Sequence, residues 1–86
     1  MDAIRGEATV AGRRGVLVAD ERVGLVWEAA VAVGEFKELV EHCGLGNLLE
    51  VSDSSGSYRA MARRWWVLPL GDEMLVRIAL ERVMAA

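Results

Sequence analysis

Eighty-six residues can enclose one hydrophobic core but not two, so we expect a single domain over residues 1–86. The chain is 53% apolar with a mean hydropathy of +0.26, although a domain this small should be more polar than average. This excess predicts a second apolar face, buried in an oligomer or against a partner. The net charge of −3, from 13 acidic and 10 basic residues, argues against a dedicated nucleic-acid binder, which is usually strongly basic.

No stretch of the sequence predicts a membrane segment. The longest apolar runs, Ala29–Gly34 and Trp65–Gly71, are far shorter than the roughly 20 residues that a bilayer requires. The first seven residues lack the basic and apolar regions of a secretory signal. Cys43 is the only cysteine, and a single thiol points to a reducing compartment. We therefore expect a cytoplasmic protein that does not contact membranes.

The first half of the chain predicts a β-meander followed by a helix. Short apolar runs between glycine- and aspartate-containing turns favour strands over Glu7–Trp27. Glu35–Cys43 is typical of a helix, because its apolar residues recur at i, i+3, i+4 and i+7. An earlier helix start, near Glu28, would place Gly34 inside the helix at a cost of roughly 1 kcal/mol.

The second half predicts two more strands, over 48–51 and 58–70, with a polar turn over 52–57 between them. Pro69 falls near a strand end, where a missing N–H donor is tolerated. For residues 72–85 two interpretations compete. A helix would place Glu73, Arg77 and Glu81 in a ladder of opposite charges at i, i+4 spacing, whereas a strand would make Gly71-Asp72 a hairpin turn. We expect the helix, because the segment is rich in helix-forming residues.

These elements predict an α+β fold: a small antiparallel sheet of four or five strands, one mid-chain helix, and a C-terminal helix packed on one face. A small Greek-key barrel with one helix fits the strand count about as well. The stretches Gly15–Asp20, Gly24–Val26 and Val67–Asp72 resemble parts of Roadblock domains. That resemblance implies a dimeric scaffold, although the long helix expected of the family is short here.

The sequence offers little for catalysis or cofactor binding, so we expect neither enzymatic activity nor a cofactor. One His and one Cys cannot supply a four-ligand zinc site within one chain. His42 and Cys43 are neighbours on the predicted helix and point about 100° apart, so they do not form a nucleophile and base pair.

The segment Arg59–Trp66 is the strongest candidate for a functional surface. It combines arginines with adjacent tryptophans, and no acidic residue occurs between Asp53 and Asp72. Arg and Trp are over-represented in the energetic centres of protein interfaces, and the same pair can bind single-stranded nucleic acid. Met74 and Ile78 are apolar but lie outside the main apolar face of the expected C-terminal helix, so they indicate a second contact surface. We predict a non-catalytic interaction, adaptor or regulatory module that forms a homo-oligomer, most simply a dimer, with nucleic-acid binding as the alternative. The candidate interface residues are Arg59, Arg63, Arg64, Trp65, Trp66, Met74 and Ile78.

Overall fold

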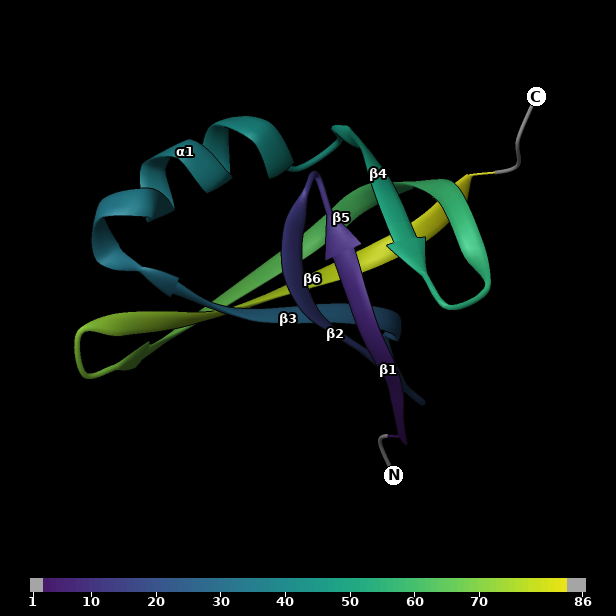
Figure 1. The fold of residues 1–86 in the computed structure, drawn as a ribbon, viewed down its shortest axis with the longest axis horizontal. Helices are drawn as coiled ribbons and strands as arrows, with labels where there is room; N and C mark the ends of the chain where they lie inside the picture. Colours follow the sequence, from purple (N-terminus) through teal and green to yellow (C-terminus); the bar gives the residue numbers. More distant parts are fainter. Residues whose placement is uncertain (1–2, 84–86) are drawn as a thin grey trace.

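The strands of the chain form a closed antiparallel barrel, seen in a computed structural model that describes residues 3–83 (Figure 1). The neighbours around the barrel are in the order β1-β2-β3-β6-β5-β4, and the pairing of β4 with β1 closes it. One helix connects β3 to β4. The elements are β1 (Ala3–Val10), β2 (Arg13–Asp20), β3 (Gly24–Ala32), α1 (Val33–Cys43), β4 (Leu48–Asp53), β5 (Gly56–Leu70) and β6 (Glu73–Val83).

The expected α+β sheet with two helices is therefore wrong. The segment predicted as a C-terminal helix is strand β6, and residues 84 and 85 of that prediction lie outside the described residues. The charges that suggested a helical ladder instead pair across strands: Arg77 Nε lies 2.8 Å from Glu28 Oε2 on β3, and Arg63 Nε lies 2.9 Å from Glu81 Oε2. Long-range pairing thus overrides the helical propensity of this segment.

The other predicted elements are confirmed. The meander is formed by β1, β2 and β3, and the strands expected over 48–51 and 58–70 correspond to β4 and β5. The helix begins at Val33, so Gly34 falls in its first turn rather than its interior. Of its predicted apolar stripe, Leu39 and Cys43 are buried, whereas Val40 is 41% exposed. Of the two architectures considered from the sequence, the structure agrees with a barrel carrying a single helix.

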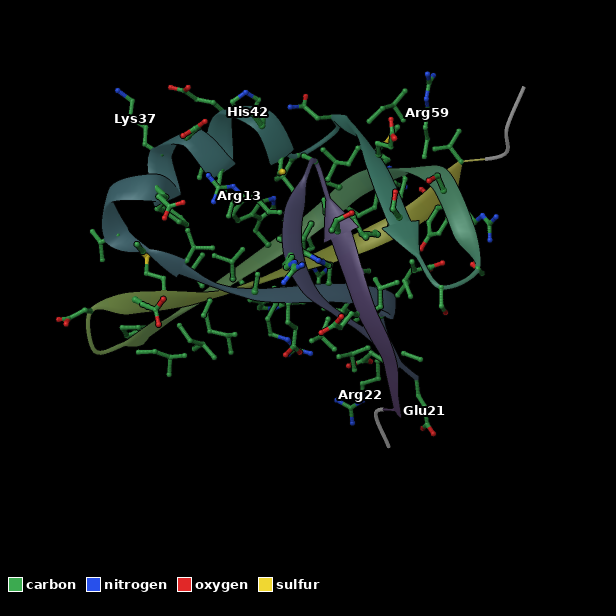
Figure 2. The ribbon with its side chains drawn as sticks, in the orientation of Figure 1. Arg13, Glu21, Arg22, Lys37, His42 and Arg59 are labelled. Atoms are coloured by element: carbon green, nitrogen blue, oxygen red, sulfur yellow. The ribbon has the colours of Figure 1, made fainter. Side chains whose placement is uncertain are left out.

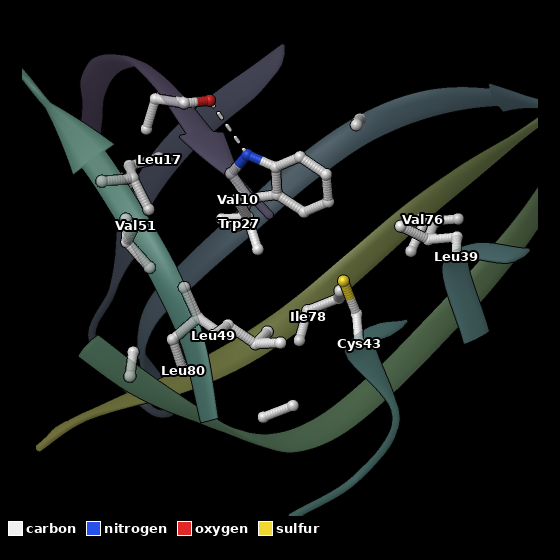
Figure 3. Packing of buried hydrophobic residues seen from close by; sticks show 14 of the residues in the cluster. Val10, Leu17, Trp27, Leu39, Cys43, Leu49, Val51, Val76, Ile78 and Leu80 are labelled. Carbon is white, nitrogen blue, oxygen red and sulfur yellow. Dashed lines mark hydrogen bonds between the residues drawn. The ribbon is translucent and has the colours of Figure 1, made fainter. Parts of the chain in front are cut away.

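Trp27 fills the middle of the barrel and is fully buried (Figure 3). Its indole Nε1 donates a hydrogen bond of 3.1 Å to the Ala8 carbonyl oxygen, so the polar atom of the ring is satisfied. Small residues make room for the indole, because Ala8 on β1 is paired with Gly15 on β2 and a Cβ atom at Gly15 would overlap the ring. The remaining core residues are mainly Val, Leu, Ile and Ala from all six strands, together with Leu39 and Cys43 from α1.

Helix α1 is fixed to the barrel at both of its ends. Near its start, Arg13 of β2 lies beneath the helix, and its Nη1 is 2.8 Å from Glu35 Oε2 (Figure 2). This contact, and mainly its hydrogen bond, raises the pKa of Arg13 above its ordinary value. At the helix end, Trp65 Nε1 donates a 3.0 Å hydrogen bond to the Cys43 carbonyl, one of the carbonyls that the helix itself leaves unpaired. The Trp65 ring also meets Phe36 edge to face, with 6.2 Å between the ring centroids.

Candidate functional site

Two of the predicted interface residues belong to the interior. Ile78 points into the barrel and has no exposed surface. Its register partner on β5 is Trp65, which packs against the core and holds the end of α1. The prediction that Ile78 forms an interface is therefore wrong, since a strand places alternate residues on opposite faces and positions 76, 78 and 80 face inward. Trp65 is half-buried and serves helix docking.

Trp66 occupies the opposite face of β5, where arginines surround it. The Arg64 guanidinium carbon lies 5.6 Å from the centroid of the Trp66 ring, and that of Arg77 lies 5.7 Å from it. Arg77 is in turn held by Glu28. The two adjacent tryptophans thus lie on opposite faces of β5, because side chains alternate along a strand. Trp66 is the one on the outer face.

Beyond Trp66, β5 and β6 continue as a hairpin that projects away from the barrel below α1 (Figure 1). Its end carries exposed apolar side chains: Leu68 is 52% exposed, Leu70 53% and Val67 37%. Met74, one of the predicted interface residues, lies half-buried on β6 opposite Pro69. We call this region the apolar tip; it comprises Val67, Leu68, Pro69, Leu70, Met74 and Leu75.

The apolar tip also has an open backbone edge. Strand β4 pairs with β5 only from Gly56 to Met61, and a loop bonds the backbone of Ala62. Within residues 3–83, no backbone hydrogen bond joins the outer edge of β5 from Trp65 to Leu70 to another element. Such an edge presents free N–H and C=O groups that can pair with another strand.

Two of the predicted arginines meet arginines from other elements in one concave cleft of about 590 Å³. Arg63 lies at the register shift of β5, between Ala62 and Arg64. They share the cleft with Arg22 of the β2–β3 turn and Arg82 of β6. Arg59 is exposed elsewhere on β5 and does not line this cleft (Figure 2). The structure therefore divides the predicted site into a basic cleft and an apolar tip.

The structure also explains two shifted acid–base groups. Burial raises the pKa of the Cys43 thiol above its ordinary value, since the thiolate would lose its hydration. Hydrogen bonds from the Ser55 hydroxyl and backbone N–H to the Asp53 carboxylate lower the pKa of Asp53, with a smaller contribution from the Arg82 charge.

The sequence prediction missed the open edge, the exposed leucines of the apolar tip, and Arg22 and Arg82. A signal for the tip was present, because apolar residues occupy both alternating positions of Val67–Leu70 instead of one. Arg22 and Arg82 carry no such signal, since only the folded barrel brings them to Arg63 and Arg64.

Comparison of the chain with protein-family models, with curated proteins and with solved structures finds no match, so the similarity to Roadblock domains receives no support. Among the described residues, no helix is long and apolar enough to cross a bilayer.

Proposed function

We propose that this protein is a non-catalytic interaction module that binds a second copy of itself through the open edge of β5. The observation that supports this most strongly is the combination of an unpaired strand edge with exposed apolar side chains in the apolar tip. Natural proteins normally block a long, apolar and unpaired edge with charges, prolines, bulges or covering segments; here Pro69 removes one N–H donor and leaves those of Trp65 and Val67. Pairing with another strand would cover it.

The backbone pattern supports an antiparallel pairing of β5 with its own copy. Leu70 and Glu73 flank the two-residue turn of the β5–β6 hairpin, so they form a hydrogen-bonded pair with each other. Hydrogen bonding then alternates along β5, and the main-chain groups of Val67, Pro69 and Trp65 point outward. A two-fold axis at Val67 would let the two Val67 residues exchange both hydrogen bonds. The Trp65 N–H would meet the carbonyl of the copy's Pro69.

The charge pattern favours a second copy as the occupant of this edge. With the two-fold axis at Val67, residues 66 and 68 lie opposite each other in the two copies, so a charged residue beside the axis would lie close to the same charge in the copy. The sequence from Trp65 to Gly71 carries no charge at all. Leu68 would lie opposite Trp66 of the copy and diagonal to the copy's Leu68, which removes apolar surface from water.

The experiment is light scattering on a sizing column with three proteins: the unmodified chain, Leu68→Glu and Leu45→Glu. Leu68 is 52% exposed and Leu45 is 65% exposed, so neither substitution should disturb the core. Leu45 lies in the loop after α1 and serves as the matched control.

We expect the unmodified chain and Leu45→Glu to elute as dimers at tens of micromolar concentration, roughly the affinity range of modest interfaces. Leu68→Glu should elute as a folded monomer, because each new carboxylate would lie against Trp66 of the copy and diagonal to the copy's own new carboxylate, beside the two-fold axis. A monomeric unmodified chain at that concentration would overturn the proposal, as would a Leu68→Glu protein that remains a dimer.

We also infer a cytoplasmic location. The support is the single thiol, Cys43, which is buried and therefore does not serve in an exposed disulfide. An adaptor or regulatory role for the module stays a prediction from the sequence.

A further inference from the structure

The basic cleft is a second surface, and its lining residues lie outside the stretch Trp65–Leu70 that forms the open edge of β5. It lies between the β2–β3 turn and the strands β5 and β6, and its volume is about 590 Å³. Its lining combines four arginines and one acidic residue with five uncharged residues. The lining residues are Arg22, Val23, Gly24, Leu25, Arg63, Arg64, Ala79, Leu80, Glu81 and Arg82.

The cleft concentrates positive charge in a molecule whose net charge is −3. Glu81 forms a salt bridge with Arg63 and so neutralises one of the four guanidinium groups. Across residues 3–83, no carboxylate forms a salt bridge with Arg22, Arg64 or Arg82. Three like charges around one concavity repel one another, and concave walls strengthen their combined field. An anion in the cleft would relieve that repulsion.

Within residues 3–83, Arg64 and Arg82 are restrained by contacts that leave their N–H donors available, and the turn that carries Arg22 is fixed by hydrogen bonds. The Arg82 guanidinium lies over the ring of Tyr58, 4.3 Å from its centroid, and Arg64 lies over Trp66. Arg22 sits on a turn fixed by Asp20, whose carboxylate accepts hydrogen bonds from the backbone N–H groups of residues 22 and 23 at 2.7 and 3.0 Å. Stacking on a ring face restrains a guanidinium without occupying its donors.

We propose that this cleft binds the phosphate groups of a nucleotide or of a single-stranded nucleic acid. Arginine donors match phosphate oxygens in geometry as well as charge. A neighbouring hollow of about 460 Å³ shares Leu25 and Arg82 with the cleft and contains Asp53, Ser55 and Tyr58. It offers hydrogen-bond acceptors and an aromatic ring beside the phosphate site, where the base and sugar would lie.

The test uses fluorescence anisotropy with a labelled oligothymidylate of about twelve nucleotides, and ATP and inorganic pyrophosphate as unlabelled competitors. The variants are Arg22→Ala with Arg64→Ala in one protein, and Arg59→Ala with Arg14→Ala in another. Arg59 and Arg14 are exposed and lie outside the cleft, so both double variants lose the same charge.

We expect the cleft variant to bind at least about tenfold more weakly, and the control variant to stay within about twofold of the unmodified protein. Binding should also weaken as the salt concentration rises from about 50 to about 200 mM, with a shallower dependence in the cleft variant. Competition by ATP or pyrophosphate at similar concentrations would identify a free nucleotide as the ligand. Oligonucleotide binding that these competitors do not displace would identify a nucleic acid.

Two results would overturn the proposal: no binding of any of the three probes at about 50 mM salt, or equal losses in the two double variants. The second result would show binding to net charge rather than to the cleft. Because Arg64 contacts Trp66 beside the open edge of β5, the size of each variant is also measured on the sizing column, which distinguishes a loss of ligand binding from a loss of self-association.

Discussion

Replacing Gly15 with Ala tests whether the Trp27 indole lies across β2 in the barrel. A Cβ atom at Gly15 would meet the Trp27 Nε1, and would lie 2.5 Å from both the Glu28 carbonyl oxygen and Trp27 Cε2. The carbonyl cannot give way, because Glu28 belongs to the β2–β3 pairing. The indole cannot give way either, because it is fully buried and bonded to Ala8.

The expected cost lies at the upper end of the usual range for overpacking, about 3 kcal/mol. For a domain of this size each kcal/mol lowers the melting temperature by about 4–8 °C, so the midpoint should fall by about 12–24 °C. Thermal unfolding followed by circular dichroism measures this shift.

Gly34→Ala is the matched control for that substitution. Gly34 lies in the first turn of α1, has no left-handed backbone angle, and a Cβ atom there would meet nothing within 4 Å. Alanine should therefore stabilise the fold by up to about 1 kcal/mol, through its better helix propensity. If Gly15→Ala melts within about 2 °C of the unmodified protein, the packing of Trp27 against β2 is wrong.

Three further predictions concern single residues. Ala11 has a φ of 52° in a two-residue turn, so Ala11→Asn should raise the free energy of unfolding by about 0.5–1 kcal/mol in urea titrations. The Cys43 thiol should react with a thiol reagent only in denaturant, since it is buried and its pKa is raised; rapid labelling of the native protein would contradict this. Because the pKa of Asp53 in the folded protein is below its ordinary value of 3.8, the ionised carboxylate stabilises the fold at pH values above 3.8. This contribution is lost as the pH falls through the lowered pKa. Asp53→Asn should therefore be less stable than the unmodified protein at neutral pH, with a difference that shrinks below about pH 4; a pH-independent difference would contradict this.

The local sequence pattern made the first three strands and the helix predictable, but it did not make the closure of the barrel predictable. The turns of the meander are marked by glycines such as Gly12 and Gly24, both with positive φ angles. The barrel closes where β1 pairs with β4. In this pairing Thr9 lies opposite Ser52, and Val10 lies opposite Val51. These partners are far apart in the sequence, and no local pattern specifies them.

The C-terminal strand was missed because its apolar residues satisfy both periodicities. Val76 and Leu80 belong to the apolar face of a helix and equally to one face of a strand. The deciding contact comes from elsewhere, since Glu28 on β3 provides the partner of Arg77. The candidate site was also predictable only in part. The Arg and Trp composition located Arg63, Arg64 and Trp66, whereas the additional arginines of the cleft depend on the three-dimensional arrangement.

Backbone hydrogen exchange at Val67, measured by NMR at high and low protein concentration, tests the proposed self-association most directly. We expect the Val67 amide to exchange slowly in concentrated solution, where it would bond to the copy's Val67, and rapidly on dilution. The Trp66 amide is the internal control, because the alternation along β5 directs it toward β6 and it should stay protected at both concentrations. A Val67 amide that exchanges rapidly even where the protein is dimeric would contradict pairing through the open edge of β5.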